Sequence, residues 1–150
     1  MIKKIGKGNC FKVTTKFLTD EGEKTFKNFA DGDKVNVYDK DGVLREAIVH
    51  NYGQQSMHEI ILENANGDKK RIQATEDHKW LLENGKFTSA LEVNSKLYNN
   101  TGDPNLTWVV KGILLHNYGI VEDVGCVEEP VTGTFTLTDN VVTGNCVYEG

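Results

Sequence analysis

Hydrophobic and polar residues alternate in short runs along most of this chain, and the runs are rich in Val, Ile, Thr, Tyr and Phe. A period of two residues is typical of half-buried β-strands. Turn sequences such as DEG, DGDK, DKDG, ANGD and ENG separate the runs. Strands are predicted over residues 11–18, 34–38, 44–50, 58–63, 70–74, 79–82, 96–98, 108–116, 121–127, 135–138 and 141–143.

No stretch shows a long apolar repeat of 3.6 residues, which a packed α-helix would need. Only short helical turns are expected, one before Gly32 within KTFKNFADGD and one before Asn94 within TSALEVNS. The pattern therefore predicts an all-β fold.

Two short sequences recur in the same order. HNYG occupies residues 50–53 and again 116–119, an offset of 116 − 50 = 66, and GDKV at 32–35 corresponds to NSKL at 94–97, an offset of 94 − 32 = 62. Each HNYG ends a β-rich run. We interpret the two matches as an internal duplication, in which two similar β units pack about a pseudo-twofold axis.

Composition narrows the possible functions. The 150 residues fit one domain with its own core. The net charge is −5, and only the first seven residues, MIKKIGK, are locally basic, which disfavours nucleic-acid binding. With no apolar run of 18 residues and no signal-peptide pattern, we expect a cytoplasmic monomer that does not bind a membrane.

Three cysteines, Cys10, Cys126 and Cys146, cannot form a closed disulfide framework, and none belongs to a CxxC pair. We therefore expect no structural zinc and no cofactor. Two of the three directly follow an Asn close to one end of the chain, in GNC at residues 8–10 and TGNC at 143–146. That placement makes these two thiols candidates for chemistry.

Four stretches in order resemble the Hint domains of inteins and Hedgehog-type autoprocessing proteins, and most of all a mini-intein without a homing endonuclease. They are CFKVTTKFLTDEG from residue 10, RIQATEDHKWLLENGKF from 71, GCVEEPVTGTFTLTDN from 125, and VVTGNC from 141. The resemblance implies a horseshoe-like Hint fold and protein splicing, in which the middle of the chain excises itself and joins its flanks. Residues 1–9 would then be an N-terminal extein remnant, 10–145 the splicing domain, and 146–150 a C-terminal extein remnant.

The resemblance also assigns roles to residues. Cys10 would attack the carbonyl of Asn9 to form a thioester, because a thiolate is a strong nucleophile. His78 would protonate the departing amide nitrogen, and Thr75 would hold the reacting amide. Cys146 would accept the acyl group, and Asn145 would cyclise and release it. The flanking exteins would be the only partners.

The sequence departs from the common intein pattern at the C-terminal junction. Many inteins have a His directly before the terminal Asn, where this chain has Gly144. A second His is common in the preceding block, where this chain has Gly133 followed by Thr134. Both usual helpers of Asn cyclisation are therefore missing.

A further departure concerns which cysteine acts first. Cys126 stands where many inteins have Asp, and with Trp80 and Thr143 it resembles a Trp-Cys-Thr class in which the internal Cys attacks the N-terminal junction. That class usually lacks a nucleophile at the first position, which here is Cys10. Either thiol can start the reaction, and we favour Cys10.

Three other functions are compatible with parts of the pattern. A cysteine hydrolase could use Cys10 and His78, although Cys10 opens a predicted strand and not a helix. An intein-like domain could cleave at its junctions without joining the flanks. A non-catalytic β-sandwich binding module would need only the all-β pattern.

Overall fold

The computed structural model describes residues 10–115 and 121–145. Within them the chain forms short 3-10 turns and strands, with no α-helix. The strands are β1 (Phe11–Lys12), β2 (Lys16–Thr19), β3 (Gly22–Thr25), β4 (Lys34–Tyr38), β5 (Leu44–Glu63), β6 (Lys69–Thr75), β7 (Trp80–Leu81), β8 (Phe87–Thr88), β9 (Val109–Leu114), β10 (Val121–Glu128), β11 (Thr134–Leu137) and β12 (Val141–Gly144). The 3-10 turns are η1 (Phe26–Asn28), η2 (Pro104–Leu106) and η3 (Thr138–Asn140).

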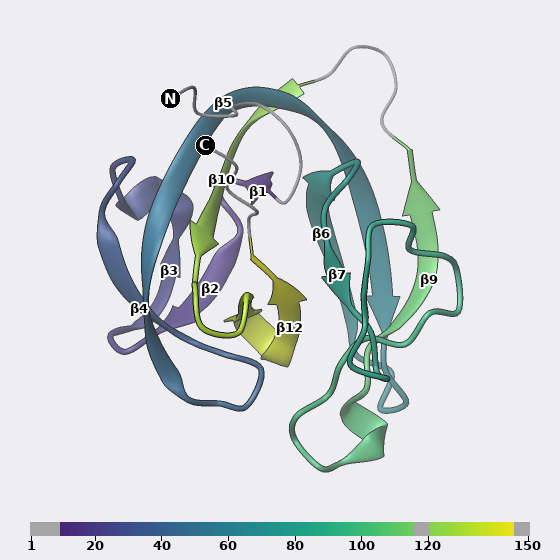
Figure 1. The fold of residues 1–150 in the computed structure, drawn as a ribbon. Helices are drawn as coiled ribbons and strands as arrows, with labels where there is room; N and C mark the ends of the chain where they lie inside the picture. Colours follow the sequence, from purple (N-terminus) through teal and green to yellow (C-terminus); the bar gives the residue numbers. More distant parts are fainter. Residues whose placement is uncertain (1–9, 116–120, 146–150) are drawn as a thin grey trace.

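The long strand β5 arches over the molecule and joins two lobes (Figure 1). Its first half pairs with β4 and β10, and its second half pairs with β6 and β9. A register shift opposite Val124 and Gly125 leaves Tyr52 as an extra residue in β5, next to Gly53 with φ +75°. A bulge of this kind bends a strand, so it explains how one strand serves both lobes.

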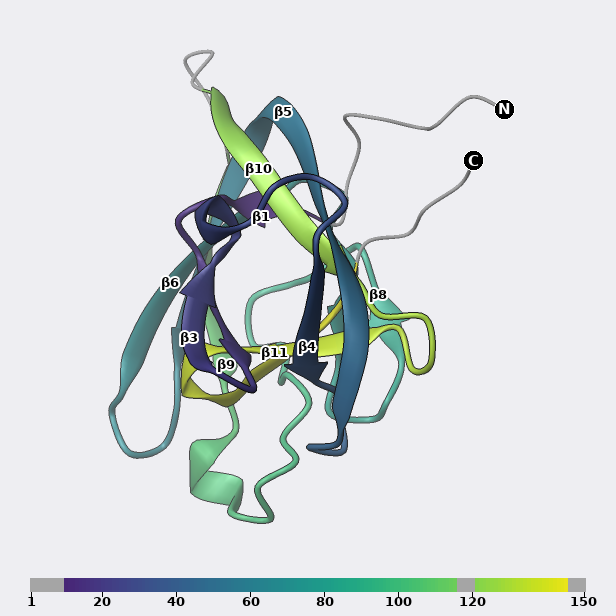
Figure 2. The ribbon, with the colours of Figure 1, turned by 90° about the vertical axis from the view of Figure 1, so that its left-hand side faces the viewer.

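The pairing is reciprocal between the two halves of the chain. The first half of β5 pairs with β10, while β9 pairs with the second half of β5, and Figure 2 shows β10 running beside β5. Equivalent main-chain hydrogen bonds mark the repeat: Gly32 N donates to Val49 O at 2.8 Å, and Asn94 N donates to Val110 O at 2.7 Å. The predicted duplication about a pseudo-twofold axis is confirmed. The second HNYG, at 116–119, lies outside the described residues.

A cluster of phenylalanines occupies the core below the arch. Phe17 stacks on Phe26 with ring centroids 4.7 Å apart, and Phe135 meets both rings edge-on. Phe11 contacts the same cluster from β1. Because offset and edge-on aromatic pairs have preferred geometries, this cluster fixes β1, β2 and β11 relative to one another.

The predicted strands agree with the observed ones in most places, and the all-β prediction is correct. The predicted 34–38 strand has the bounds of β4. The predicted strands 44–50 and 58–63 are one strand, β5, and the predicted 11–18 strand is divided by a turn into β1 and β2. The prediction missed β3 and β8, and residues 96–98 form only isolated bridges.

The first expected helical turn is present as η1, but the second is wrong because residues 88–95 contain no helix. Ser95 N bonds Glu92 O instead, in a turn that places Asn94 at φ +78°. A residue at positive φ cannot continue a right-handed helix.

Gly125 offers a test of the sheet packing. A Cβ at this position would lie 2.8 Å from Phe26 Cβ, whereas a Cβ at Gly112 would have nothing closer than 3.4 Å. We expect Gly125→Ala to lower the free energy of unfolding by about 1–3 kcal/mol through overpacking. Gly112→Ala, the matched control, should change it by less than about 0.5 kcal/mol. Urea unfolding of both variants measures the difference, and equal stabilities would contradict the packing described.

Candidate active site

Cys10 is held at the start of the described chain by pairing on both sides of β1. Phe11 pairs with Gly125 of β10 on one side and with Ala74 of β6 on the other. Thr75 then brackets Cys10: its Oγ1 accepts from Cys10 N at 3.2 Å, and its N donates to Cys10 O at 3.0 Å. Cys10 is fully buried. Thr75 therefore lies directly beside the main chain of Cys10.

His78 lies in the turn that follows β6. His78 N donates to Thr75 O at 3.0 Å, so the spacing of three residues closes a turn that directs the imidazole back toward β1. The ring packs between Phe11, at 4.3 Å between centroids, and Trp80, at 4.6 Å. Its Nε2 shares a 2.7 Å hydrogen bond with Thr143 Oγ1.

Burial controls the charge of His78. The imidazole is fully buried, and desolvation lowers its pKa from 6.5 to about 3. The ring is therefore neutral at neutral pH and has a single N–H. Its Nδ1 is buried and has no hydrogen-bond partner within the described residues. An unpartnered buried nitrogen is a feature that a purely structural histidine rarely keeps.

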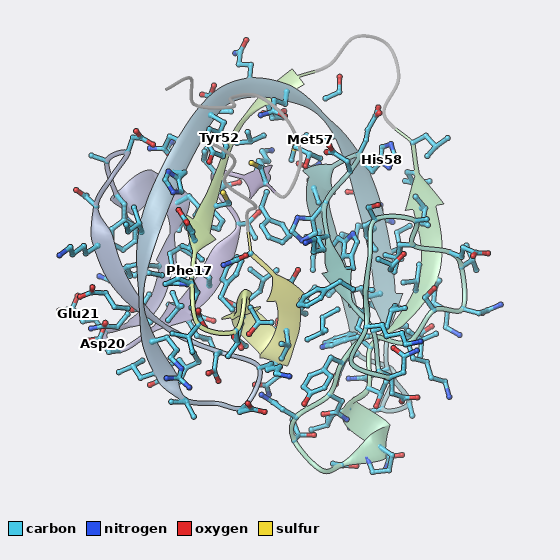
Figure 3. The ribbon with its side chains drawn as sticks, in the orientation of Figure 1. Phe17, Asp20, Glu21, Tyr52, Met57 and His58 are labelled. Carbon is cyan, nitrogen blue, oxygen red and sulfur yellow. The ribbon has the colours of Figure 1, made fainter. Side chains whose placement is uncertain are left out.

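Cys126 lies in β10, opposite Cys10. Because Phe11 pairs with Gly125 in an antiparallel ladder, one step back along the chain from Phe11 places Cys10 opposite Cys126. Residues directly opposite in such a ladder have Cα atoms about 5 Å apart. Both thiols belong to one buried cluster with Val124, Tyr52 and Met57, the last two on β5 where it arches over the molecule (Figure 3). The structure thus brings both candidate nucleophiles together.

The other two members of the Trp-Cys-Thr signature gather around His78. Trp80 meets the imidazole edge-on, and Thr143 shares its hydrogen bond with Nε2. Thr143 lies in β12, two residues before Asn145, and pairs with Phe135 in β11. The signature therefore forms a single site, with Trp80 and Thr143 on the histidine and Cys126 opposite Cys10.

Asn145 directly follows β12 and packs against the turn between β10 and β11. Its main-chain N donates to Gly133 O at 2.9 Å, and its side-chain Nδ2 donates to Glu129 O at 2.6 Å. Asn145 is 7% exposed. Asn145 is thus held to one turn at two points, by its main chain at Gly133 and by its side-chain amide at Glu129.

The structure explains why the two usual histidines are glycines here. A Cβ at Gly144 would lie 2.5 Å from Lys79 O, so no side chain fits. Gly133 has φ +71°, a backbone conformation that L-residues other than Asn and Asp seldom adopt. Residues 133 and 144 are therefore held close to main chain, where the common intein pattern has histidines.

Sequence reasoning missed Glu129, whose main-chain oxygen contacts Asn145 and whose carboxylate is 1% exposed. No local pattern distinguishes it from the neighbouring Glu128, which bonds His50 at 2.9 Å. His50 is buried and its Glu128 partner is partly exposed, and His58 is a partly exposed strand residue near Glu76. Asn9, His116 and Cys146 lie outside the described residues.

Within residues 10–115 and 121–145, no three His, Cys, Asp or Glu side chains are placed to share a metal ion. In the same part of the chain, no helix has the length and apolar character needed to cross a membrane.

Solved structures match this fold over almost the whole chain. A substituted gp41-1 intein matches with a TM-score of 0.70 and 22% identity, over 92% of this chain and 100% of its own. A DnaB intein from Synechocystis sp. PCC 6803 matches with a TM-score of 0.70 and 16% identity, over 92% and 99% of the two chains. This chain has the intein fold. A bacterial intein-like domain from Clostridium thermocellum also matches, with a TM-score of 0.67 and 22% identity over 93% and 100%. No protein-family model and no curated protein matches the sequence.

The buried histidine of this intein fold predicts a pH dependence of stability. The pKa of His78 is about 3 in the folded chain and 6.5 in the unfolded one, so the unfolded chain binds more protons between these values. Stability should therefore fall as pH decreases through this window, by about 1.4 kcal/mol per pH unit. Between pH 7 and pH 5 the unsubstituted chain should lose about 2 kcal/mol more than His78→Gln. Urea unfolding at both pH values measures this, and equal losses in the two proteins would show that His78 is not held neutral.

Proposed function

We propose that this chain is a self-splicing mini-intein that excises residues 10–145 and joins its two flanks. One observation carries the proposal. His78 contacts the N-terminal junction through Phe11 and the C-terminal junction through Thr143, so a single buried imidazole lies between residues that are more than a hundred positions apart in sequence. The intein fold of the matched structures supports the same conclusion.

The first step is an N-to-S acyl shift at Asn9–Cys10. The Cys10 thiol loses its proton and its sulfur attacks the Asn9 carbonyl carbon. A C–S bond forms, the C–N bond breaks, and the Cys10 nitrogen gains a proton and becomes an amine. Thr75 holds the reacting nitrogen through its Oγ1. His78 donates its N–H proton to that nitrogen as a general acid, and the proton released by the Cys10 thiol replaces it, so the imidazole is neutral again after the step.

The remaining steps transfer the acyl group and release the intein. The Cys146 thiol attacks the thioester, which frees the Cys10 thiol. Asn145 Nδ2 then attacks its own carbonyl carbon, and the bond to Cys146 breaks, leaving a succinimide on Asn145 and an amine on Cys146. That amine attacks the new thioester and forms an Asn9–Cys146 peptide bond. Because these bonds are consumed, each chain reacts once.

The position of Cys126 supports a second order for the first half of the reaction. Cys126 lies opposite Cys10 in the same buried cluster, and its thiol could take the acyl group before it passes to Cys146. We retain Cys10 as the first nucleophile because Thr75 brackets its main chain.

We also propose that the chain acts in cis, as a monomer whose partners are its own flanks. A cytoplasmic location suits the chemistry, because reducing conditions keep the Cys10 and Cys126 thiols from oxidising. One alternative is a domain that cleaves its junctions without ligation, which the absence of histidines at positions 133 and 144 makes worth testing.

Splicing is tested by the intact mass of the purified chain. We expect an excised segment of 145 − 10 + 1 = 136 residues and a ligated peptide that joins residue 9 to residue 146. Release of both flanks without ligation would identify the cleaving domain instead. A chain that stays whole after incubation with thiol and at raised temperature would contradict the proposal, as a binding module would behave in this way.

Two separate variants, Cys10→Ala and Cys126→Ala, test which thiol attacks the Asn9 carbonyl first. Each is combined with Asn145→Ala to block the C-terminal step. We expect Cys10→Ala to abolish thiol-induced cleavage after Asn9 and Cys126→Ala to retain most of it. Cleavage is followed by mass spectrometry. If only Cys126→Ala abolishes cleavage, Cys126 attacks first.

A further inference from the structure

We infer that Glu129 is the positioning residue for Asn145 cyclisation, and that the turn it organises replaces the two missing histidines. This inference rests on the proposed function, because it concerns the step that releases the C-terminal flank. It assigns to Glu129 a role that is carried by contacts and not by the family pattern.

The turn between β10 and β11 holds Asn145 by its main chain. Glu129 O accepts from Gly133 N at 3.2 Å and from Asn145 Nδ2 at 2.6 Å. Gly133 O in turn accepts from Asn145 N. The direction of the Nδ2 group therefore depends on the exact path of residues 129–133.

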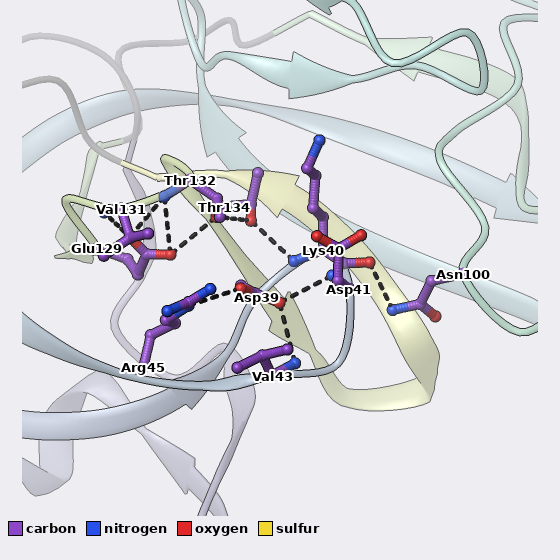
Figure 4. A network of polar contacts seen from close by, with 10 residues as sticks. All are labelled: Asp39, Lys40, Asp41, Val43, Arg45, Asn100, Glu129, Val131, Thr132 and Thr134. Carbon is purple, nitrogen blue, oxygen red and sulfur yellow. Dashed lines mark hydrogen bonds and ion pairs between the residues drawn. The ribbon is translucent and has the colours of Figure 1, made fainter.

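The carboxylate of Glu129 shapes that path. Because Pro130 has no N–H, the first main-chain donors after Glu129 are those of Val131 and Thr132, and the carboxylate accepts from both. It also accepts from Thr132 Oγ1 at 2.8 Å, as Figure 4 shows. A carboxylate this buried is costly unless hydrogen bonds satisfy it, and here the turn supplies them all.

A second turn anchors the first. Thr134 Oγ1 contacts Thr132 Oγ1 and accepts from Lys40 N at 2.9 Å, which ties the Glu129 turn to the β4–β5 turn (Figure 4). There the buried Asp39 carboxylate accepts from the Asp41 and Val43 N–H groups and from Arg45 Nε.

Asp39 is ionised, which makes this anchor strong. Burial alone would raise the pKa of Asp39, but the hydrogen bond from Arg45 and those from the two N–H groups outweigh it and lower the pKa. Two buried acidic caps, Glu129 and Asp39, thus hold in place the turns against which Asn145 packs.

The contact with Nδ2 bears directly on cyclisation. An amide nitrogen is a poor nucleophile, because its lone pair is delocalised into the carbonyl. Donation of one N–H to the Glu129 oxygen polarises the nitrogen and limits rotation of the side chain. In addition, small displacements of a reacting atom cost much rate, since reaction requires a near-attack geometry. Loss of the Glu129 carboxylate should therefore slow the C-terminal step selectively.

The test uses the full chain with Cys10→Ala and Cys126→Ala, in which only the C-terminal junction can react. The rate of release of residues 146–150 is followed by intact mass, together with the succinimide on Asn145, which is one water lighter than the free acid. Glu129→Ala should slow release by about tenfold or more, because Asn145 loses its fixed geometry. Glu129→Gln retains an acceptor oxygen for the turn and should stay within about threefold of the parent.

A second readout separates positioning from general loss of structure. In chains with Asn145→Ala, thiol-induced cleavage at Asn9–Cys10 should be unchanged within about twofold by Glu129→Ala, because the turn contacts Asn145 and the β4–β5 turn, whereas Thr75 holds Cys10. The matched control is Asn64→Ala, which removes another buried cap from the Asn66 and Asp68 N–H groups in the β5–β6 turn. It should leave the C-terminal rate near that of the parent.

The inference is overturned if Glu129→Ala releases the flank at the parent rate, slows both junctions equally, or slows release no more than Asn64→Ala. If Glu129→Ala does not fold, Thr132→Val decides, since it removes the hydroxyl that joins Glu129 to Thr134. It should slow only the C-terminal step, and an unchanged rate overturns the inference. A parent that cleaves at neither junction contradicts the proposed function itself.

Discussion

The site depends on the pairing of one residue, Phe11, with two strands at once. Its main chain pairs with Gly125 in β10 and with Ala74 in β6, so the two-residue strand β1 closes the sheet between the lobes. That pairing sets Cys10 opposite Cys126 and next to Thr75. The Phe11 ring then packs on His78, which places the imidazole. Gly125 makes the arrangement possible, because any Cβ there would meet Phe26 at 2.8 Å. One short strand therefore couples the packing of the core to the position of the reacting thiol.

The sequence predicted the fold best where apolar alternation was strong, as in β4. It divided β5 into two strands because the stretch from Asn51 to Ser56 is mostly polar, although the chain there continues as a strand over the arch. It missed β3, whose GEKT sequence has no apolar residue to mark a buried face. It joined β1 and β2, since a turn inside a run of strand-forming residues leaves little local signal. These differences arise from long-range pairing, which local patterns do not report.

The predicted site residues that the structure describes lie together. They could be predicted because the four motifs were interpreted as a set, and each motif includes the end of a strand. What the sequence could not reveal was the reason for the two glycines. The clash that a Cβ at Gly144 would make with Lys79 O joins residues 65 positions apart. Glu129 was missed for a similar reason, because it reaches Asn145 through its main-chain oxygen while its carboxylate bonds only its own turn. The contacts that hold Asn145 are therefore made by backbone atoms, and backbone contacts leave no residue type to recognise.

The proton on His78 links the two junctions. A neutral imidazole has one N–H, and the proposed general-acid role requires that proton on Nδ1, toward the unpaired side of the ring. Nε2 must then accept the hydrogen bond from Thr143 Oγ1, at 2.7 Å. The Thr143 hydroxyl has a single proton and also lies 3.3 Å from Gly144 O, so it cannot donate to both. When Thr143 donates to Gly144 O, the imidazole must donate through Nε2, and Nδ1 is left without a proton. Under the proposed mechanism, the Thr143 hydroxyl therefore determines whether His78, which packs on Phe11, can act as an acid. This gives a threonine in β12 a physical link to the distant N-terminal bond.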